Sequence, residues 1–209
     1  MSKAYSKFKK TICRCEDLVN TYLELNKLPS SYGISPNKDI VRGAVILAVS
    51  ALDAYVTDVF SEKFITYMKT KTPDKTIIDL LSAAGLDTKT ALDLIKMDRP
   101  YRRIRTLIDK YYCRYTTQNF RVIDDIFKIY HLQNITANAE KMTGRTTIRD
   151  SVRILIERRH EIAHNGDYDK FGRVKDIDEK SILKRIKDLG VLVTNMDTLI
   201  DKKIPIKSN

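Results

Sequence analysis

The segment Arg159-His-Glu-Ile-Ala-His164 concentrates the acid–base groups of this sequence, because it holds two of the three histidines of the 209-residue chain beside an arginine. An imidazole changes its charge near neutral pH and can therefore accept or release a proton during a reaction. A guanidinium stays charged and can hold an anion through several N–H groups. This spacing predicts a site where protons are transferred beside a bound anion.

A helix over residues 148–164 is predicted to position these groups. The segment Thr147-Ile-Arg-Asp150 is typical of a capping box at a helix start, and Asn165-Gly166 is a strong stop signal. At about 100° per residue, Arg159 falls at the centre of the apolar face. The apolar residues within about 60° of it on this helical projection are Ile148, Val152, Leu155, Ile156, Ile162 and Ala163.

An arginine at the centre of an apolar face must meet an anion, because an unpaired buried charge is costly. One candidate partner within the chain is Asp53, in the helix expected at the centre of the fold. One flank of the same face is predicted to be entirely basic, with Arg149, Arg153, His160 and His164. A plainer interpretation stays open, in which the flanking arginines are solvated and the histidines interact with the helix dipole.

The whole chain is predicted to form one all-α domain over residues 1–209, a helical bundle with additional short helices. Seven glycines and five prolines are few for this length and favour long helices. Pro29, Gly33 and Pro36 are expected to separate the first two. The predicted helices cover about residues 4–28, 37–71, 74–83, 88–97, 101–115, 118–130, 148–164 and 178–201.

Two of these helices are expected to carry the core beside residues 148–164. Residues 43–56 are apolar nearly all round, as in a helix that is enclosed by others. The last helix opens at Asp178 and carries an apolar packing stripe with spacings of three and four residues. The stripe consists of Ile182, Ile186, Leu189, Val193, Met196 and Ile200.

Charge and composition predict a soluble cytosolic protein that meets a polyanion. The net charge of +11 favours nucleic acid or a membrane surface as a partner, and a merely well-solvated surface is the alternative. The basic N-terminus is not followed by the apolar core of a secretory signal. The longest apolar run, residues 44–56, is shorter than the roughly 20 residues needed to span a bilayer. Three cysteines, an odd number, suit a reducing compartment.

The motif at residues 159–164 matches the R-x4-H signature of HEPN domains, with a polar residue directly after the arginine and Asn165-Gly166 following it. The segment Ala51-Leu-Asp-Ala-Tyr-Val56 resembles the early helix of the same domains, and is closest to the RiboL-PSP type. The resemblance covers the two core helices. It implies an all-α HEPN-like fold.

The same resemblance implies metal-independent cleavage of RNA, without a cofactor, in a cleft where the Arg and His of two protomers of a homodimer face each other. His164 would be the general acid or base and Arg159 the phosphate stabiliser, with His160 and Asn165 in support and Asp53 orienting the arginine. The resemblance also implies a role as a toxin or in defence or RNA processing, with an antitoxin or regulatory partner, because such roles are common in the family. No membrane partner is expected.

Several further residues are expected to contact RNA. The backbone-binding candidates are Arg149 and Arg153, and the cluster Arg99, Arg102, Arg103 and Arg105. Tyr101, Tyr111 and Tyr112 are candidates for base stacking, with a core or interface role as the alternative.

Two alternative functions remain open from the sequence. The string His160-Glu-Ile-Ala-His164 also reads as the H-E-x-x-H motif of zinc proteases, in which both histidines bind zinc. Arg158 and Arg159 before it disfavour a bound dication, and no third ligand stands at the expected place. We therefore expect no metal site. The second alternative is a catalytically silent HEPN module that binds RNA or a protein.

Overall fold

The computed structural model describes residues 1–27, 37–112, 115 and 117–205. Within these ranges the chain is all helix and loop, and β pairing is limited to a single bridge between Tyr168 and Val174. The predicted all-α class is confirmed. The expected helix break at Pro29, Gly33 and Pro36 lies outside the described residues.

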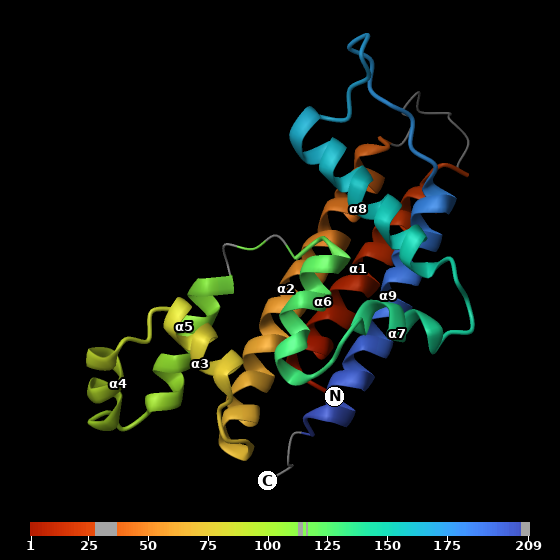
Figure 1. Cartoon of the computed structure of the whole chain (residues 1–209). Coiled ribbons are helices and arrows are strands. Elements are labelled where there is room, and N and C mark those ends of the chain that lie inside the picture. The colour runs from red at the N-terminus through yellow and green to blue at the C-terminus, as the bar shows by residue number, and fades with distance from the viewer. Residues whose placement is uncertain (28–36, 113–114, 116, 206–209) are drawn as a thin grey trace.

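Three long helices form the body of the fold (Figure 1). These are α1 (Lys3–Leu25), α2 (Asp39–Thr70) and α9 (Glu179–Lys203). Helix α2 packs against both others and is lined by small and branched apolar side chains, which allow close approach on several sides. All six residues of the predicted α9 stripe are buried, and the Asp178 carboxylate accepts hydrogen bonds from the backbone N–H groups of Lys180 and Ser181.

Helix α8 (Ile148–Asn165) packs on α2 and α9 and carries the R-x4-H motif. It is preceded by α6 (Phe120–Phe127), a 3₁₀ turn (Lys128–Tyr130) and α7 (Ile135–Lys141), which packs on α9. Helix α7 was not predicted, because its seven residues are too few to show a helical period. The predicted stop at Asn165-Gly166 is confirmed, since Gly166 has a left-handed φ of 61°.

The capping box predicted at the start of α8 is wrong. The Thr147 side chain makes no capping hydrogen bond. The backbone N–H of Arg149 donates instead to Glu140 Oε1 of α7 at 2.9 Å. A side chain from a neighbouring helix thus satisfies the helix end in place of a local one.

Three short helices form a lobe beside α2, drawn in yellow and green at the left of Figure 1. They are α3 (Lys75–Ala83), α4 (Thr88–Ile95) and α5 (Pro100–Tyr112), and the lobe is joined to α2 through α5. Figure 1 places it well away from α8.

Helix α2 is long and apolar enough to cross a bilayer by length and composition. The helix has 32 residues, whereas the interrupted apolar run within it, residues 44–56, is too short by itself to span a bilayer. However, 56% of its most apolar window is buried inside the structure, and α1, α5, α8 and α9 all pack on it. This packing is that of a core helix.

Candidate active site

The motif lies on the half of α8 that extends beyond the core. Val152 and Leu155 in the first half are fully buried, whereas Ile162 is half-buried and Ala163 is exposed. The predicted apolar face is therefore fully buried in its first half, whereas in its second half Ile162 packs against the core only in part and Ala163 is exposed. Arg159 is half-buried at the point where α8 leaves the core.

The Arg159 guanidinium lacks an anionic partner among the residues that the structure describes. Its Nε is buried and has no hydrogen-bond partner there. The predicted ion pair with Asp53 is not formed in this part of the chain: the Asp53 carboxylate accepts hydrogen bonds from Thr117 Oγ1 at 2.6 Å and from Gln118 Nε2. A buried donor without a partner is costly, so Arg159 is available to an external anion.

Two imidazoles lie close together on adjacent turns of α8. His160 and His164 are exposed, with ring centroids 4.3 Å apart and planes inclined by 49°. Their spacing of four residues places one ring above the other along the helix. Two groups able to transfer protons thus lie close to Arg159 along α8, His160 at the next position and His164 about one and a half turns further on. Asn165, predicted to support them, is exposed at the end of the helix.

An open groove runs beside His160, between α8 and the start of α6. Its volume is about 700 Å³. The α8 side is formed by Ile156, Glu157, His160 and Glu161, and the opposite side by Tyr115, Gln118, Asn119 and Val122. The groove has the His160 imidazole in its lining.

The predicted basic edge of α8 is only partly basic. The exposed Arg153 guanidinium forms ion pairs with Asp150 at 3.1 Å and with Glu157 at 3.4 Å, so its charge is balanced locally. Arg149 forms no ion pair among the described residues: its guanidinium carbon lies 5.2 Å from the Phe120 ring centroid, and its buried Nε has no hydrogen-bond partner there. The expectation of an entirely basic edge is therefore corrected to one arginine without a described ion pair and two imidazoles.

The arginine cluster at residues 99–105 is not brought to the motif. Its members are exposed on and before α5, in the lobe that Figure 1 places away from α8. Of the candidate stacking tyrosines, Tyr112 is buried in the aromatic core, where its ring centroid is 4.6 Å from that of Phe60. Tyr101 is exposed with Lys69 Nζ 4.9 Å from its centroid. The core alternative therefore holds for Tyr112.

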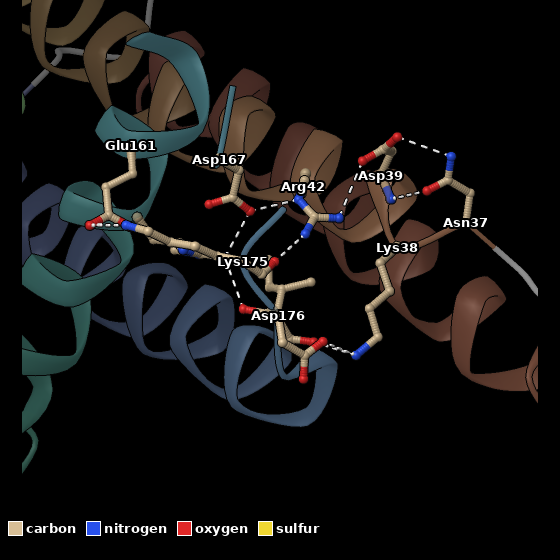
Figure 2. A network of polar contacts seen from close by, with 10 residues as sticks. Asn37, Lys38, Asp39, Arg42, Glu161, Asp167, Lys175 and Asp176 are labelled. Carbon is tan, nitrogen blue, oxygen red and sulfur yellow. Dashed lines mark hydrogen bonds and ion pairs between the residues drawn. The ribbon is translucent and has the colours of Figure 1, made fainter. Parts of the chain in front are cut away.

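A buried ionic network behind the motif was not predicted. Asp167 is completely buried with φ 63°, and its Oδ2 accepts hydrogen bonds from Arg42 Nε at 2.6 Å and from Arg158 Nη2 at 2.8 Å. Figure 2 shows Arg42 reaching Asp167 from the start of α2. The one available sequence signal was Arg42, a lone cation beside an otherwise apolar helix segment.

The network continues over the loop between α8 and α9. Glu161 forms ion pairs with Arg158 at 3.0 Å and with Lys175 at 3.2 Å, as Figure 2 shows for the lysine. The hydrogen bond from Lys175, assisted by that from Arg158, lowers the pKa of Glu161. Lys38 Nζ lies 2.6 Å from Asp176 Oδ1. The end of α8 is therefore fixed to α2 by side chains more than 100 positions apart in the sequence.

The zinc-protease alternative requires Glu161 to activate a metal-bound water. Glu161 is instead held by two cations on the side of the network. Among the described residues, no group of three or more His, Cys, Asp or Glu side chains is arranged to hold a metal ion. The residues present do not fit a zinc site.

The fold and the site together define an all-helical domain that bears an R-x4-H motif at the end of its penultimate helix. A family model described as RiboL-PSP-HEPN matches residues 11–202, and the chain belongs to this family. Membership indicates a nuclease or an RNA-binding module. No match to the chain was found among curated proteins or solved structures.

Proposed function

We propose that the protein is a metal-independent endoribonuclease whose site is built on the end of α8. The observation that carries the proposal is the half-buried Arg159, whose Nε has no partner in the described structure, on the same end of α8 as the closely spaced His160 and His164 imidazoles. An unpaired cation beside two exposed imidazoles suits a phosphodiester that is cleaved by acid–base catalysis. Family membership supports RNA as the substrate.

The proposed reaction uses the RNA's own 2′-hydroxyl as the nucleophile. An imidazole, assigned to His164, accepts the 2′-hydroxyl proton while the oxygen attacks the adjacent phosphorus. The bond from phosphorus to the 5′-oxygen breaks, and a second imidazole donates a proton to that leaving oxygen. Arg159 stabilises the extra negative charge on the phosphoryl oxygens. The products are a 2′,3′-cyclic phosphate and a 5′-hydroxyl, and His160 supports the proton transfers.

A second copy of the chain is proposed to complete the cleft. His164 is five positions after Arg159, which places their side chains about 140° apart around α8. The two groups of one protomer therefore point to different flanks of the helix. The small Ala163 side chain is exposed on the same turn and allows a partner helix to approach closely. A cytosolic toxin or defence role, with a restraining antitoxin, is the setting that this activity would fit.

A silent RNA-binding module is the second candidate function. It is favoured only by the family, in which both activities are expected. A module that only binds RNA would not require an unpaired arginine and two imidazoles on the same end of a helix.

Cleavage of a synthetic RNA in excess EDTA tests the proposal. Wild-type protein is expected to cut it, and His164→Ala and Arg159→Ala are each expected to reduce the rate by about 100-fold or more. His131→Asn is the matched control, since it removes an exposed histidine outside α8 at a left-handed position that asparagine tolerates. Salt-dependent RNA binding without cleavage would establish the silent module, and EDTA-sensitive proteolysis would overturn both.

A further inference from the structure

The loop between α8 and α9 contains a small hairpin with a defined conformation, residues 168–174. Tyr168 and Val174 form its bridge, and the N–H of Asp169 donates to the carbonyl of Arg173 at 2.8 Å. The Asp169 carboxylate accepts hydrogen bonds from the backbone N–H groups of Phe171 at 2.8 Å and of Arg173 at 2.9 Å. Gly172 adopts a left-handed φ of 76° that closes the turn. These bonds hold the backbone of the hairpin in one shape.

The base of the hairpin is anchored in the buried ionic network. The N–H of Lys175 donates to the carbonyl of Asp167 at 2.7 Å, directly below the bridge. Asp167 is itself held by Arg42 of α2 and Arg158 of α8. Figure 2 shows Asp167 and Lys175 at this junction. The hairpin therefore projects from a fixed base.

Large apolar side chains are exposed on this hairpin. Phe171 is 68% exposed, Tyr168 is 53% exposed and Val174 is 51% exposed. Exposing three such side chains on a short segment is unfavourable in water unless they bind something. The hairpin is thus built as a contact surface.

Cations surround the exposed Phe171 ring. Lys170 Nζ lies 5.0 Å from the ring centroid and Arg173 Cζ lies 5.3 Å from it. The Asp169 carboxylate turns inward to the backbone and pairs with Arg173 Nε at 3.3 Å, and its side chain is 27% exposed against 75% for Arg173. The outward surface therefore combines an aromatic ring with two cations that lie over it, and a base that stacks on the ring displaces one of them toward a phosphate.

The hairpin begins four residues after His164. The Tyr168 ring lies against the helix end, because a Cβ atom added at Gly166 would be 3.1 Å from its Cε2. The hairpin therefore lies beside the end of the helix that carries the motif.

We infer that residues 168–174 form a second contact site for single-stranded RNA, in which Phe171 stacks on an unpaired base and Lys170 and Arg173 contact its flanking phosphates. The inference rests on the proposed function. Aromatic faces bind the π-face of any base, and adjacent cations match the phosphates on either side. Duplex RNA offers no such unstacked base, so the site selects single strands near the scissile bond.

Tryptophan fluorescence tests this directly, because the chain contains no tryptophan. In a His164→Ala background that prevents cleavage, Phe171→Trp places the only indole at the hairpin. An unstructured 12-nucleotide RNA is expected to quench it, and a duplex of the same sequence is not. Leu92→Trp, at an exposed leucine of α4, is the matched control and should show no quenching.

Binding affinities complete the test. In the His164→Ala background, Phe171→Ala is expected to weaken binding of the 12-mer about tenfold, whereas Phe171→Tyr and Leu92→Ala should bind within twofold of the parent. Unchanged affinity in Phe171→Ala, an equal loss for duplex RNA, or Phe171-dependent binding to anionic phosphatidylserine vesicles in place of RNA would each overturn the inference.

If wild-type protein cleaves RNA but Phe171→Ala binds normally, the proposed function stands and the hairpin site fails. If no variant cleaves RNA but RNA binding depends on Phe171, the hairpin site stands and the proposed ribonuclease activity fails.

Discussion

Arg158 Nη2 lies 2.8 Å from Asp167 Oδ2, so the residue directly before the motif arginine is bound to the buried residue that follows the helix stop. Two adjacent arginines therefore have different tasks. Arg158 fixes the end of α8 to the loop and, through Asp167, to Arg42 of α2. Arg159 stays without a partner in the described part of the chain. The ion pairs of Arg158 thus anchor the end of α8 that carries Arg159.

Replacing Asp167 with alanine is expected to destabilise the protein by about 3 kcal/mol, because two partly buried guanidinium groups then lose their carboxylate. Urea denaturation measures the change. Asp150→Ala is the control, since it removes an exposed pair with Arg153 and should cost less than about 1 kcal/mol. Equal losses for the two variants would show that the buried network has no special role.

Asp53→Asn is expected to leave RNA cleavage by the folded protein within about threefold of wild type, far from the loss expected for Arg159→Ala. The reason is that Asp53 bonds to Thr117 and Gln118, which connects α2 to the segment before α6. Stability should fall by about 1 kcal/mol. A loss of activity as large as that of Arg159→Ala would restore Asp53 as the residue that orients the arginine.

Ala163→Arg is expected to produce a folded monomer without ribonuclease activity, because a long charged side chain replaces a small exposed one where the partner helix is proposed to approach. Sedimentation velocity measures the oligomeric state of the variant beside that of wild type, which is proposed to be a dimer. Ile154→Arg, at an exposed position of α8 that does not belong to the motif, is the comparison variant. An active monomer, in wild type or variant, would contradict a shared cleft.

Asp197 is expected to make the stability depend on pH. Burial raises the pKa of this carboxyl, which accepts hydrogen bonds from Ser2 Oγ at 2.7 Å and from the Tyr55 hydroxyl at 3.2 Å. A raised folded-state pKa gives stability that is present below the unfolded value of about 3.9 and is lost as the pH rises through the folded value. Asp197→Asn should therefore gain stability relative to wild type as the pH rises from about 3.5 to 6. Urea midpoints that keep a constant difference over this range would refute this.

Local sequence patterns were sufficient to predict the long helices. The Asn165-Gly166 stop and the Asp178 cap depend only on neighbouring backbone groups, and the α9 stripe follows from helical periodicity. Helix α7 was not predicted because it is short. Helix α8 begins at Ile148 as predicted, but its cap was not predicted because Glu140, from another helix, supplies it.

The site was predictable only in part. The periodicity of α8 continues through Ala163, but it contains no information on where the helix leaves the core. The pairing of Arg42 with Asp167 joins residues 125 positions apart, so no local pattern reveals it. Asp150 and Glu157 are close to Arg153 in the sequence, yet whether they balance its charge depends on side-chain geometry.

Cleavage of two matched oligonucleotides in EDTA tests the central claim most directly. One is all ribose, and the other carries 2′-O-methyl groups throughout and so lacks the attacking hydroxyl. Wild-type protein should cut only the first and leave 2′,3′-cyclic phosphate and 5′-hydroxyl ends, and His164→Ala should cut neither. Cleavage of the methylated strand, products with a 5′-phosphate, or full activity in His164→Ala would contradict a ribonuclease that works through the 2′-hydroxyl and the imidazole at the end of α8.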